Sequence, residues 1–312
     1  MKQVSEYIQT TPYKEYEINV ASADASFRKY YRLTKEDKSF LLMDSSLEKE
    51  SLAPFLDVTQ RLKNAGVNVP EIYEQNLSLG YLILEDFGDT HLLSQLNAAN
   101  FKTLYKQAID AIITIQEAET TGLPLYDKAF LHFEMELMQE WFLEKKLGLT
   151  LTQMQLTLLE KALENIANAV LEQPQNIFVH RDYHSRNIML TSAGELGIID
   201  YQDAMNGAIT YDLVSLLKDC YIAFKRSDIE KLALYFRDKK GLDVSDAEFL
   251  RWFDFMGLQR HIKVLGIFSR LHLRDEKDGY LKDIPLTRQY VIDTAKRYDE
   301  TKELAAFLEQ HT

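Results

Sequence analysis

The stretch HRDYHSRN at residues 180–187 is followed shortly by IIDYQD at residues 198–203. Together they place two histidines, three carboxylates and two amides within a short span of the chain. Such a group of polar side chains has three interpretations: a metal-binding cluster, a phosphotransfer site, or a polar loop without chemistry. The spacing of these side chains, and the apolar residues between them, discriminate among the three.

The residues between the two polar stretches favour a β-hairpin. NIML and LGIID form short apolar runs, and TSAGE between them supplies a turn that contains Gly194. Opposed residues of an antiparallel hairpin have Cβ atoms about 4.5–5.5 Å apart, so we expect Asn187 and Asp200 side by side, with Asp182 one short loop away. Oxygen ligands grouped in this way, and few enough to leave room for water and phosphates, suit magnesium.

A zinc hydrolase is the alternative suggested by His180, Asp182 and His184. Catalytic zinc usually takes three protein ligands and a water, but alternate residues of an extended loop point in different directions. The chain has seven histidines, and none of the others forms a second cluster with Asp or Glu at short range. A supporting role for His180 through hydrogen bonds in its own loop fits, but it does not account for Asp182, Asn187 and Asp200 together.

Composition limits the classes of protein to consider. A chain of 312 residues with 46% hydrophobic content is long enough for a globular protein of two lobes. A net charge of -12 and a pI near 5.1 argue against nucleic acid as the partner, because that binding needs clustered Lys and Arg. The acidic surface favours solubility, and nothing in the sequence indicates an obligate protein partner.

The cellular location is predicted from the single cysteine and the apolar runs. Cys220 cannot form an intramolecular disulfide, and its apolar helical surroundings favour a buried thiol and a reducing compartment. The N-terminal segment lacks an apolar stretch long enough for a signal peptide, and no run of about 18 apolar residues occurs. We therefore expect a cytoplasmic protein without membrane association.

The chain changes character near residue 90, and we predict an N-terminal lobe at 1–88 and a helical C-terminal lobe at 89–312. The first lobe alternates short apolar runs with turns and has one helical stretch around 50–65. In the second lobe, helical periodicity covers most of 126–172 and 212–311. The same spacing recurs in Phe101, Leu104, Tyr105, Ala108, Ile112 and Ile115. The fold class is therefore α+β, with a hinge near LEDFGD.

The order His180, Arg181, Asp182, four residues, Asn187, a hairpin and then Asp200 matches the catalytic and metal motifs of the protein-kinase-like superfamily. IDYQD in place of D-F-G, with a helical second lobe, resembles the aminoglycoside phosphotransferase branch. HRDYHSRNIM, GIIDYQDAMNGAITYDLVSLLKDCY and GLQRHIKVLGIFSRLHLRD further resemble the bacterial N-acetylmuramate/N-acetylglucosamine anomeric kinases of cell-wall recycling. The resemblance extends from residue 23 to about residue 290.

This resemblance implies a phosphotransferase that uses ATP and Mg²⁺ to phosphorylate the C1 hydroxyl of an amino sugar. The nucleotide would bind in the N-terminal lobe, and the C-terminal lobe would carry the sugar site. Asp182 would orient the attacking hydroxyl, and Asn187 and Asp200 would hold the metal against the phosphates. Asp212, which begins a helix, would stabilise that helix end or brace the catalytic loop.

Residues 86–88 spell D-F-G but precede the catalytic loop, whereas the metal-binding Asp of a kinase-like chain follows it. We interpret them as part of the hinge. Backbone groups around Glu85 and Phe87 would then bind adenine. Met189 and Ile199, on the two hairpin strands, would form its apolar floor, although ordinary core packing explains both residues equally.

Two features depart from the resembled pattern. The phosphate-covering loop ASADASFR has no glycine, so Ser22 and Ser26 would contact phosphate unless the segment is a plain surface turn. Met43 occupies the place of the lysine that pairs with the α and β phosphates. Arg28 and Arg32, which share a strand face under period-two alternation, are the candidate cations; a solvated strand face is the alternative. Without a replacing cation the chain would be a nucleotide-binding pseudokinase.

Sugar contacts are predicted from polar residues in the strings most like the anomeric kinases. They are Arg186, Gln202, Arg260 and His261. A cation among them would suit the lactyl carboxylate of N-acetylmuramate. Arg260 and the nearby Lys263 would equally fit a helix surface with snorkelling side chains. Choline, homoserine, fructosamines and aminoglycosides are the alternative substrates of the superfamily.

Overall fold

The computed structural model of the protein describes residues 2–22 and 28–312. The chain forms two compact units. The first combines Met1–Leu92 with Asn187–Asp203, and the second combines Leu93–Arg186 with Ala204–Thr312. We predicted a boundary after residue 88 and placed the hairpin with the helical lobe. The packing instead groups the hairpin residues with the N-terminal unit, while the functional division between the lobes stays a prediction.

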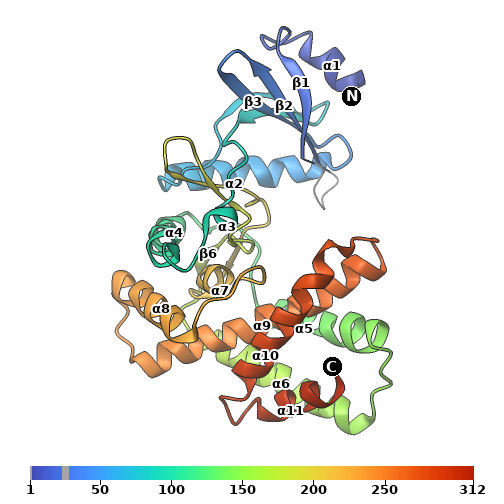
Figure 1. The fold of residues 1–312 in the computed structure, drawn as a ribbon, viewed down its shortest axis with the longest axis vertical. Helices are drawn as coiled ribbons and strands as arrows, with labels where there is room; N and C mark the ends of the chain where they lie inside the picture. Colours follow the sequence, from blue (N-terminus) through green and yellow to red (C-terminus); the bar gives the residue numbers. More distant parts are fainter. Residues whose placement is uncertain (1, 23–27) are drawn as a thin grey trace. The chain divides into compact units, whose positions relative to one another are not determined.

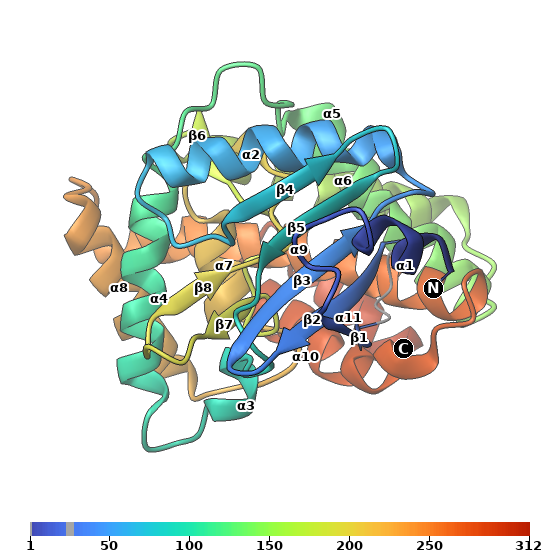
Figure 2. The ribbon, with the colours of Figure 1, turned by 90° about the horizontal axis from the view of Figure 1, so that it is seen from above.

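The first unit is built on a five-stranded antiparallel sheet in the order β1-β2-β3-β5-β4, seen face-on in Figure 2. Its strands are β1 (Glu17–Ser22), β2 (Lys29–Lys35), β3 (Lys38–Asp44), β4 (Ile72–Asn76) and β5 (Tyr81–Glu85). This confirms the small N-terminal sheet predicted from the short alternating runs. Short connections join β2 to β3 and β4 to β5, whereas α2 (Leu52–Asn64) lies between β3 and β4 in the chain.

Period-two alternation separates the two faces of this sheet. Tyr31, Leu33 and Leu42 lie on one face and pack with Tyr7 and Ile8 of α1 (Lys2–Ile8), which covers that face (Figure 1). The opposite face carries the intervening residues of the same strands. Helix α1 therefore covers one face of the sheet, and the opposite face is available to pack against the other elements of this unit.

Helix α2 confirms the predicted helical stretch at 50–65, with a short 3₁₀ turn η1 (Lys49–Ser51) before it. Its buried side packs against the segment that follows the hairpin. The Phe55 and Tyr201 rings stack with centroids 5.2 Å apart, and the Thr59 and Tyr201 hydroxyls are hydrogen-bonded at 2.9 Å. These contacts join residues far apart in sequence, which explains why 187–203 packs as part of the first unit.

The predicted hairpin is present as β7 (Ile188–Leu190) and β8 (Leu196–Ile198), with Ile188 opposite Ile198. Gly194 supplies the turn at φ +80°, a conformation that other residues rarely adopt. The hairpin is hydrogen-bonded to neighbouring segments of the first unit. The Ile198 N–H donates to the Asn68 carbonyl at 2.9 Å, and the Leu190 N–H donates to the Thr90 carbonyl at 2.8 Å.

The second unit is mainly helical, as predicted, with one two-stranded sheet that the periodicity did not indicate. Its helices are α3 (Leu92–Gln95, at the boundary), α4 (Phe101–Ile115), α5 (Lys128–Leu137), the π-helix η2 (Met138–Lys146), α6 (Gln153–Leu171), α7 (Tyr211–Leu217), α8 (Arg226–Lys240), α9 (Asp246–Leu273), the 3₁₀ helix η3 (Asp278–Asp283), α10 (Ile284–Ala295) and α11 (Lys302–His311). The sheet pairs β6 (Ile177–Val179) with β9 (Met205–Gly207).

Helix α9 is the centre of this unit and is buried along most of its length. Ser245 caps its start by accepting a hydrogen bond from the Glu248 N–H at 3.2 Å, and acidic residues occupy its first turn. Gly266 permits a close approach to the end of α5, because a Cβ there would lie 2.3 Å from the Leu137 carbonyl carbon. Within residues 2–22 and 28–312, no helix has both the length and the apolar character needed to cross a membrane.

Candidate active site

Asn187 and Asp200 lie side by side at the open end of the hairpin, as predicted. The Asn187 Nδ2 donates to Asp200 Oδ2 at 3.1 Å, and the Asn187 carbonyl accepts from the Ile199 N–H at 3.1 Å. Gln202 Nε2 donates to the other Asp200 oxygen at 3.0 Å. Asp200 is exposed and adopts φ +65°, which is uncommon for a residue with a side chain. The pair brings one carboxylate and one amide side chain together at the same strand ends.

The D-F-G triplet at 86–88 follows β5, and its aspartate hydrogen-bonds neighbouring strands of the sheet. Asp86 accepts hydrogen bonds from Arg32 Nε at 2.7 Å and Nη2 at 3.2 Å, and Ser39 donates to the same carboxylate. Asp89 accepts from the two Arg32 terminal nitrogens at 2.7 and 2.8 Å. Arg32 therefore ties β2 to the predicted hinge segment, and its positive charge is offset there by two carboxylates.

Phe87 packs directly on the hairpin. Its ring lies where a side chain of Gly197 would begin, since a Cβ on Gly197 would be 2.5 Å from Phe87 Cδ2 and 2.6 Å from Cε2. Met189 is the cross-strand partner of Gly197 and is buried, whereas Ile199 is half-buried. The Glu85 N–H donates to the Glu71 carbonyl at 2.8 Å, so an adenine contact at Glu85 would use its carbonyl oxygen.

The candidates for the missing strand lysine differ in their surroundings. Met43 is fully buried on β3, and its sulfur accepts a hydrogen bond from the Tyr30 hydroxyl at 3.5 Å. Of the two predicted cations, Arg32 is engaged by Asp86 and Asp89, whereas Arg28 is buried just before β2. The phosphate role of Arg28 and Arg32 stays a prediction. Ser26 and the side chain of Ser22, which were also predicted phosphate contacts, lie outside the described residues.

Two aspartates hold the backbone of the HRDYHSRN loop. Asp212, in the first turn of α7, accepts hydrogen bonds from the His180 N–H at 2.8 Å and the Arg181 N–H at 3.1 Å. This confirms the bracing role that the resemblance implied. Asp219 accepts from the Ser185 N–H at 3.0 Å and from the Ser185 hydroxyl. The loop is thus fixed at both ends, which positions the Asp182 carboxylate between them.

Asp182 is kept ionised by the charges around it. Burial alone would raise its pKa, but the positive charges of Lys263, His184 and Arg181, followed by Arg260, hold the pKa of this carboxyl below its ordinary value. Its own N–H donates to His180 Nδ1 at 3.3 Å. Asp182 can therefore accept hydrogen bonds over the whole neutral range of pH.

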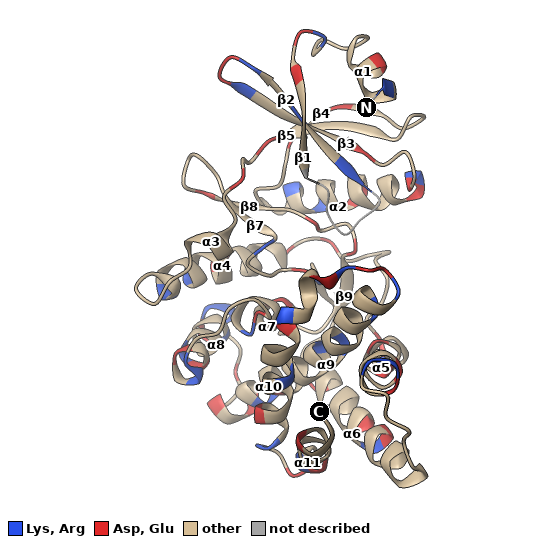
Figure 3. Ribbon diagram, turned by 45° about the vertical axis from the view of Figure 1, so that its right-hand side comes forward, with Lys and Arg blue, Asp and Glu red and all other residues tan. Residues whose placement is uncertain are grey.

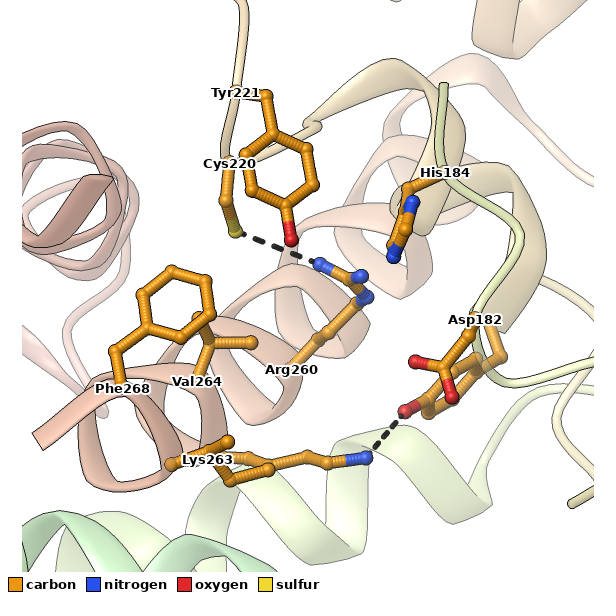
Figure 4. Close-up of a pocket in the computed structure, with 10 residues that line it drawn as sticks. Asp182, His184, Cys220, Tyr221, Arg260, Lys263, Val264 and Phe268 are labelled. Atoms are coloured by element: carbon orange, nitrogen blue, oxygen red, sulfur yellow. Dashed lines mark hydrogen bonds between the residues drawn. The ribbon is translucent and has the colours of Figure 1, made fainter. Parts of the chain in front are cut away.

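Asp182 lines a pocket in the second unit, shown in Figure 4. The other lining residues come from the catalytic loop, from α7 and the segment after it, and from α9. They are His184, Tyr211, Cys220, Tyr221, Arg260, Lys263, Val264, Ile267 and Phe268. Asp182 is the one carboxylate among the residues lining this pocket, and it faces two permanent cations from α9. The opposite wall is aromatic and aliphatic.

Lys263 and Arg181 share a buried counter-ion, Glu134 on α5. Glu134 Oε1 is 2.7 Å from Arg181 Nη2 and 2.9 Å from Lys263 Nζ, and Lys263 also donates to the Tyr211 hydroxyl at 3.1 Å. Burial alone would raise the pKa of Glu134, but these two cations hold it below its ordinary value. Gln259 donates to the remaining Glu134 oxygen at 3.2 Å. These ion pairs and hydrogen bonds hold the Lys263 ammonium in position at the pocket wall.

The structure separates the four predicted sugar contacts. Arg260 lines the pocket, with only 5% of its surface exposed, which rules out the alternative of a snorkelling surface residue. His261 does not line it: the ring is wholly buried, 2.8 Å from the Lys218 carbonyl and stacked on Tyr290. Burial and the adjacent charges of Arg260 and Lys218 lower the pKa of His261 to about 3, so it is neutral.

The other two predicted contacts lie elsewhere. Gln202 belongs to the first unit and hydrogen-bonds Asp200. The Arg186 guanidinium stacks on the Tyr221 ring at 3.5 Å and lies 4.0 Å from Asp283, so it supports a pocket wall without being one of the lining residues. Consecutive side chains of a helix point in different directions, which is why Arg260 lines the pocket and the adjacent His261 does not.

Several residues of the site were missed by sequence reasoning. Glu134 and Asp219 are buried acids within apolar helical patterns, a signal that a buried partner exists. Lys263 was weighed as a surface residue, yet it is 7% exposed and paired with Glu134. Tyr221 carried no signal, because an aromatic residue in an apolar run is indistinguishable from core.

The zinc alternative has no support in the geometry. The His180 side chain is fully buried and its Nδ1 accepts the Asp182 N–H, as a loop-supporting residue would. Across the part of the chain that the structure describes, no group of three or more His, Cys, Asp or Glu side chains is arranged to hold a metal ion. A two-ligand site for a cation that keeps waters and phosphates is a different arrangement, and such a role for the adjacent Asn187 and Asp200 stays a prediction.

Known proteins match this chain over most of its length. The family model of the phosphotransferase enzyme family matches residues 17–248. An N-acetylmuramate/N-acetylglucosamine kinase of Neisseria meningitidis is 40% identical, over 97% of this chain and 93% of the relative. The protein of the same name from Pseudomonas aeruginosa is 38% identical, over 94% of this chain and 88% of the relative.

Solved structures share the fold at low sequence identity. The ADP-bound aminoglycoside phosphotransferase APH(2'')-Ib superposes with a TM-score of 0.65 at 16% identity, covering 94% of this chain and 98% of that one. The choline kinase LicA from Streptococcus pneumoniae gives 0.63 at 14% identity, with coverages of 94% and 98%. These likenesses confirm the two-lobed protein-kinase-like fold. The chain belongs to the phosphotransferase enzyme family and is a kinase.

Proposed function

We propose that the protein transfers the γ-phosphoryl group of ATP to the anomeric hydroxyl of N-acetylmuramate or N-acetylglucosamine. Two relatives at 38–40% identity that cover nearly the whole chain bear the name of kinases for these sugars. The observation that carries the proposal within the molecule is the pocket in which Asp182 faces Arg260 and Lys263. Such a pocket suits a neutral or anionic acceptor.

Asp182 would accept a hydrogen bond from the attacking hydroxyl and direct it in line with the γ-phosphorus. Its lowered pKa makes it too weak a base to remove the proton beforehand. In a loose transition state that is unnecessary, because the new oxygen–phosphorus bond forms late and the proton leaves with it. The bond between the γ-phosphorus and the bridging oxygen breaks, and ADP departs. An anomeric hydroxyl suits this chemistry, since the ring oxygen makes it a better proton donor than other sugar hydroxyls.

The first unit would bind the nucleotide. The Asp200 carboxylate and the Asn187 amide oxygen fit magnesium by donor type and number, and both sit on adjacent strand ends. Magnesium held there supplies charge neutralisation on the phosphates. Glu85 and Phe87 would offer backbone groups to adenine over a floor of Met189 and Ile199. Arg28 would meet phosphate charge in place of the absent lysine.

The lining residues disfavour the other substrates of the superfamily that carry positive charge. Choline and aminoglycosides need carboxylates or an aromatic cage, but this pocket presents Arg260 and Lys263 and a single carboxylate, Asp182. The turnover experiment below distinguishes the proposed activity from that of a homoserine kinase, a fructosamine kinase or a nucleotide-binding pseudokinase. ATP and sugars recovered from the cell wall meet in the cytoplasm, which is where the activity would serve recycling.

The test is to incubate the protein with ATP, magnesium and a panel of amino sugars, amines and alcohols, and to locate transferred phosphate by NMR. N-Acetylmuramate or N-acetylglucosamine should be phosphorylated at C1, and their methyl glycosides, in which the C1 oxygen is blocked, should not react. The product should be labile in mild acid, because a glycosyl phosphate can cleave through an oxocarbenium ion. Turnover of methyl glycosides, or an acid-stable product, would contradict the anomeric position while leaving the kinase in place.

A further inference from the structure

The guanidinium of Arg260 is a buried charge without a carboxylate in direct contact. The residue is 5% exposed, points into the pocket in Figure 4, and donates to the Cys220 sulfur at 3.7 Å. Among the described residues, no carboxylate lies within 4.0 Å of this guanidinium. Its neighbour Lys263, one turn away on α9, has Glu134 at 2.9 Å. The two cations of the pocket therefore differ: one has a protein counter-ion and the other has none in contact.

Burying such a charge is costly, and arginine cannot avoid the cost by releasing its proton. The Cys220 thiol is a poor partner, because burial raises its pKa and keeps it uncharged. Asp182 and Asp219 are close enough to interact electrostatically, but Asp182 is needed to orient the acceptor hydroxyl and Asp219 accepts from the Ser185 N–H. A buried guanidinium that lines a pocket and has no carboxylate in contact is explained if the ligand brings the anion.

The charge pattern along α9 supports an anionic ligand. Its acidic residues, Asp246, Glu248 and Asp254, lie in the first third of the helix together with Arg251, and the charged side chains that follow are Arg260, Lys263 and Arg270. Figure 3 shows the blue positions that recur along this helix. The part of α9 that lines the pocket thus presents positive charge alone. Guanidinium groups bind planar carboxylates through two parallel hydrogen bonds, which gives selectivity as well as affinity.

We propose that Arg260 binds the lactyl carboxylate of N-acetylmuramate and makes the kinase prefer this sugar to N-acetylglucosamine, which lacks that group. The inference rests on the proposed function. Arg260 and Asp182 line one pocket, so a sugar whose C1 hydroxyl meets Asp182 presents its other substituents to the remaining walls. The transferred phosphate is the second oxyanion that a guanidinium would recognise, and the experiment separates the two.

Kinetics would be measured for the wild type and Arg260→Gln with N-acetylmuramate, its lactyl amide and N-acetylglucosamine. The wild type should prefer the acid to the amide by about 10²-fold in kcat/KM, as expected for a buried charge pair with one partner removed. In Arg260→Gln this preference should fall to within about threefold. An equal loss on all three substrates would assign Arg260 to the phosphate or to Asp182, and an unchanged preference for the acid would equally overturn the proposal.

Two further variants complete the design. Arg260→Lys keeps the charge but loses the two-point geometry, so it should retain part of the preference for the acid; it also replaces Arg260→Gln if that variant does not fold. Arg251→Gln removes an arginine from the same helix outside the pocket, where it pairs with Glu300 at 3.1 Å, and should leave the preference unchanged. If the wild type phosphorylates none of the three substrates, the proposed function fails and this inference with it.

Discussion

Gly197→Ala tests whether the segment around Phe87 binds the nucleotide. The new Cβ would lie 2.5 Å from Phe87 Cδ2 and 2.6 Å from Cε2, whereas carbon atoms in contact are normally about 3.5–4.0 Å apart. The buried ring must therefore move by about 1 Å or more, since Gly197 sits within the β8 strand and has little freedom to retreat. Overpacking of this kind costs about 1–3 kcal/mol.

Because the Phe87 backbone is proposed to bind adenine, displacement of this residue should weaken nucleotide binding. If the whole cost appears in binding, the dissociation constant for ADP with magnesium rises by about 5- to 150-fold. Titration calorimetry measures the affinity, and urea unfolding measures the part of the cost that appears as lost stability. Phe87→Leu combined with Gly197→Ala should recover part of the affinity, because the smaller side chain leaves room for the methyl group.

Gly194→Ala is the matched control in the same hairpin. No atom lies within 4 Å of the position that the new methyl group would take, but the φ of +80° strains any residue with a side chain, by about 1–2 kcal/mol. It should lower stability and leave ADP affinity unchanged. Wild-type affinity in Gly197→Ala, with the ring displaced, would refute the assignment of adenine to the Phe87 segment.

Three further predictions concern the aspartates. Asp182→Asn should lower kcat by about 10²-fold or more while ADP affinity persists, since its contact acts on the chemical step; near-normal kcat in steady-state assays would remove it from catalysis. Asp200→Asn should abolish magnesium-dependent turnover with an unchanged circular dichroism spectrum, because it removes a charged ligand and keeps the shape; retained turnover at ordinary magnesium would contradict the metal role. Burial raises the pKa of the Asp212 carboxyl to about 6, whereas its pKa in the unfolded chain is about 3.9. The native state therefore binds the Asp212 proton more tightly than the unfolded chain does. The stability that this gives is fully present below pH 3.9 and is lost as the pH rises through 6. Relative to Asp212→Asn, the free energy of unfolding of the wild type should fall by about 2 kcal/mol between pH 4 and pH 7 in urea titrations, and a constant difference would show that Asp212 does not titrate in this range.

The sequence by itself determined the hairpin and the contact between its two polar ends, because both are encoded by neighbours in the chain. The spacing of Asn187 and Asp200 around an alternating hairpin predicted that these side chains would meet, and their contact at 3.1 Å follows from strand pairing alone. The catalytic chemistry predicted for them and for Asp182 rests on the same local spacing. Likewise, the small sheet and the long helices follow from periods of two and 3.6 residues, which are local properties of the backbone.

Only the tertiary structure decided which of the remaining polar residues belong to the site. Helix α9 is buried on nearly all sides, so its sequence has no polar stripe to show which positions face a pocket and which face the core. Arg260 lines the pocket and His261 does not, though both belong to the same matching string. The charge of Lys263 is balanced by Glu134, which lies 129 residues earlier in the chain.

The choice of a cation to replace the absent strand lysine also depends on the tertiary structure. Alternation placed Arg28 and Arg32 on one face of a strand and made them equivalent, and nothing local distinguishes them. Their difference comes from Asp86 and Asp89, which reach Arg32 from a segment more than fifty residues away. Charge pairing over such separations depends on how the chain packs, so a sequence can name the candidate cations, and only the folded chain shows that Arg32 is paired with two carboxylates.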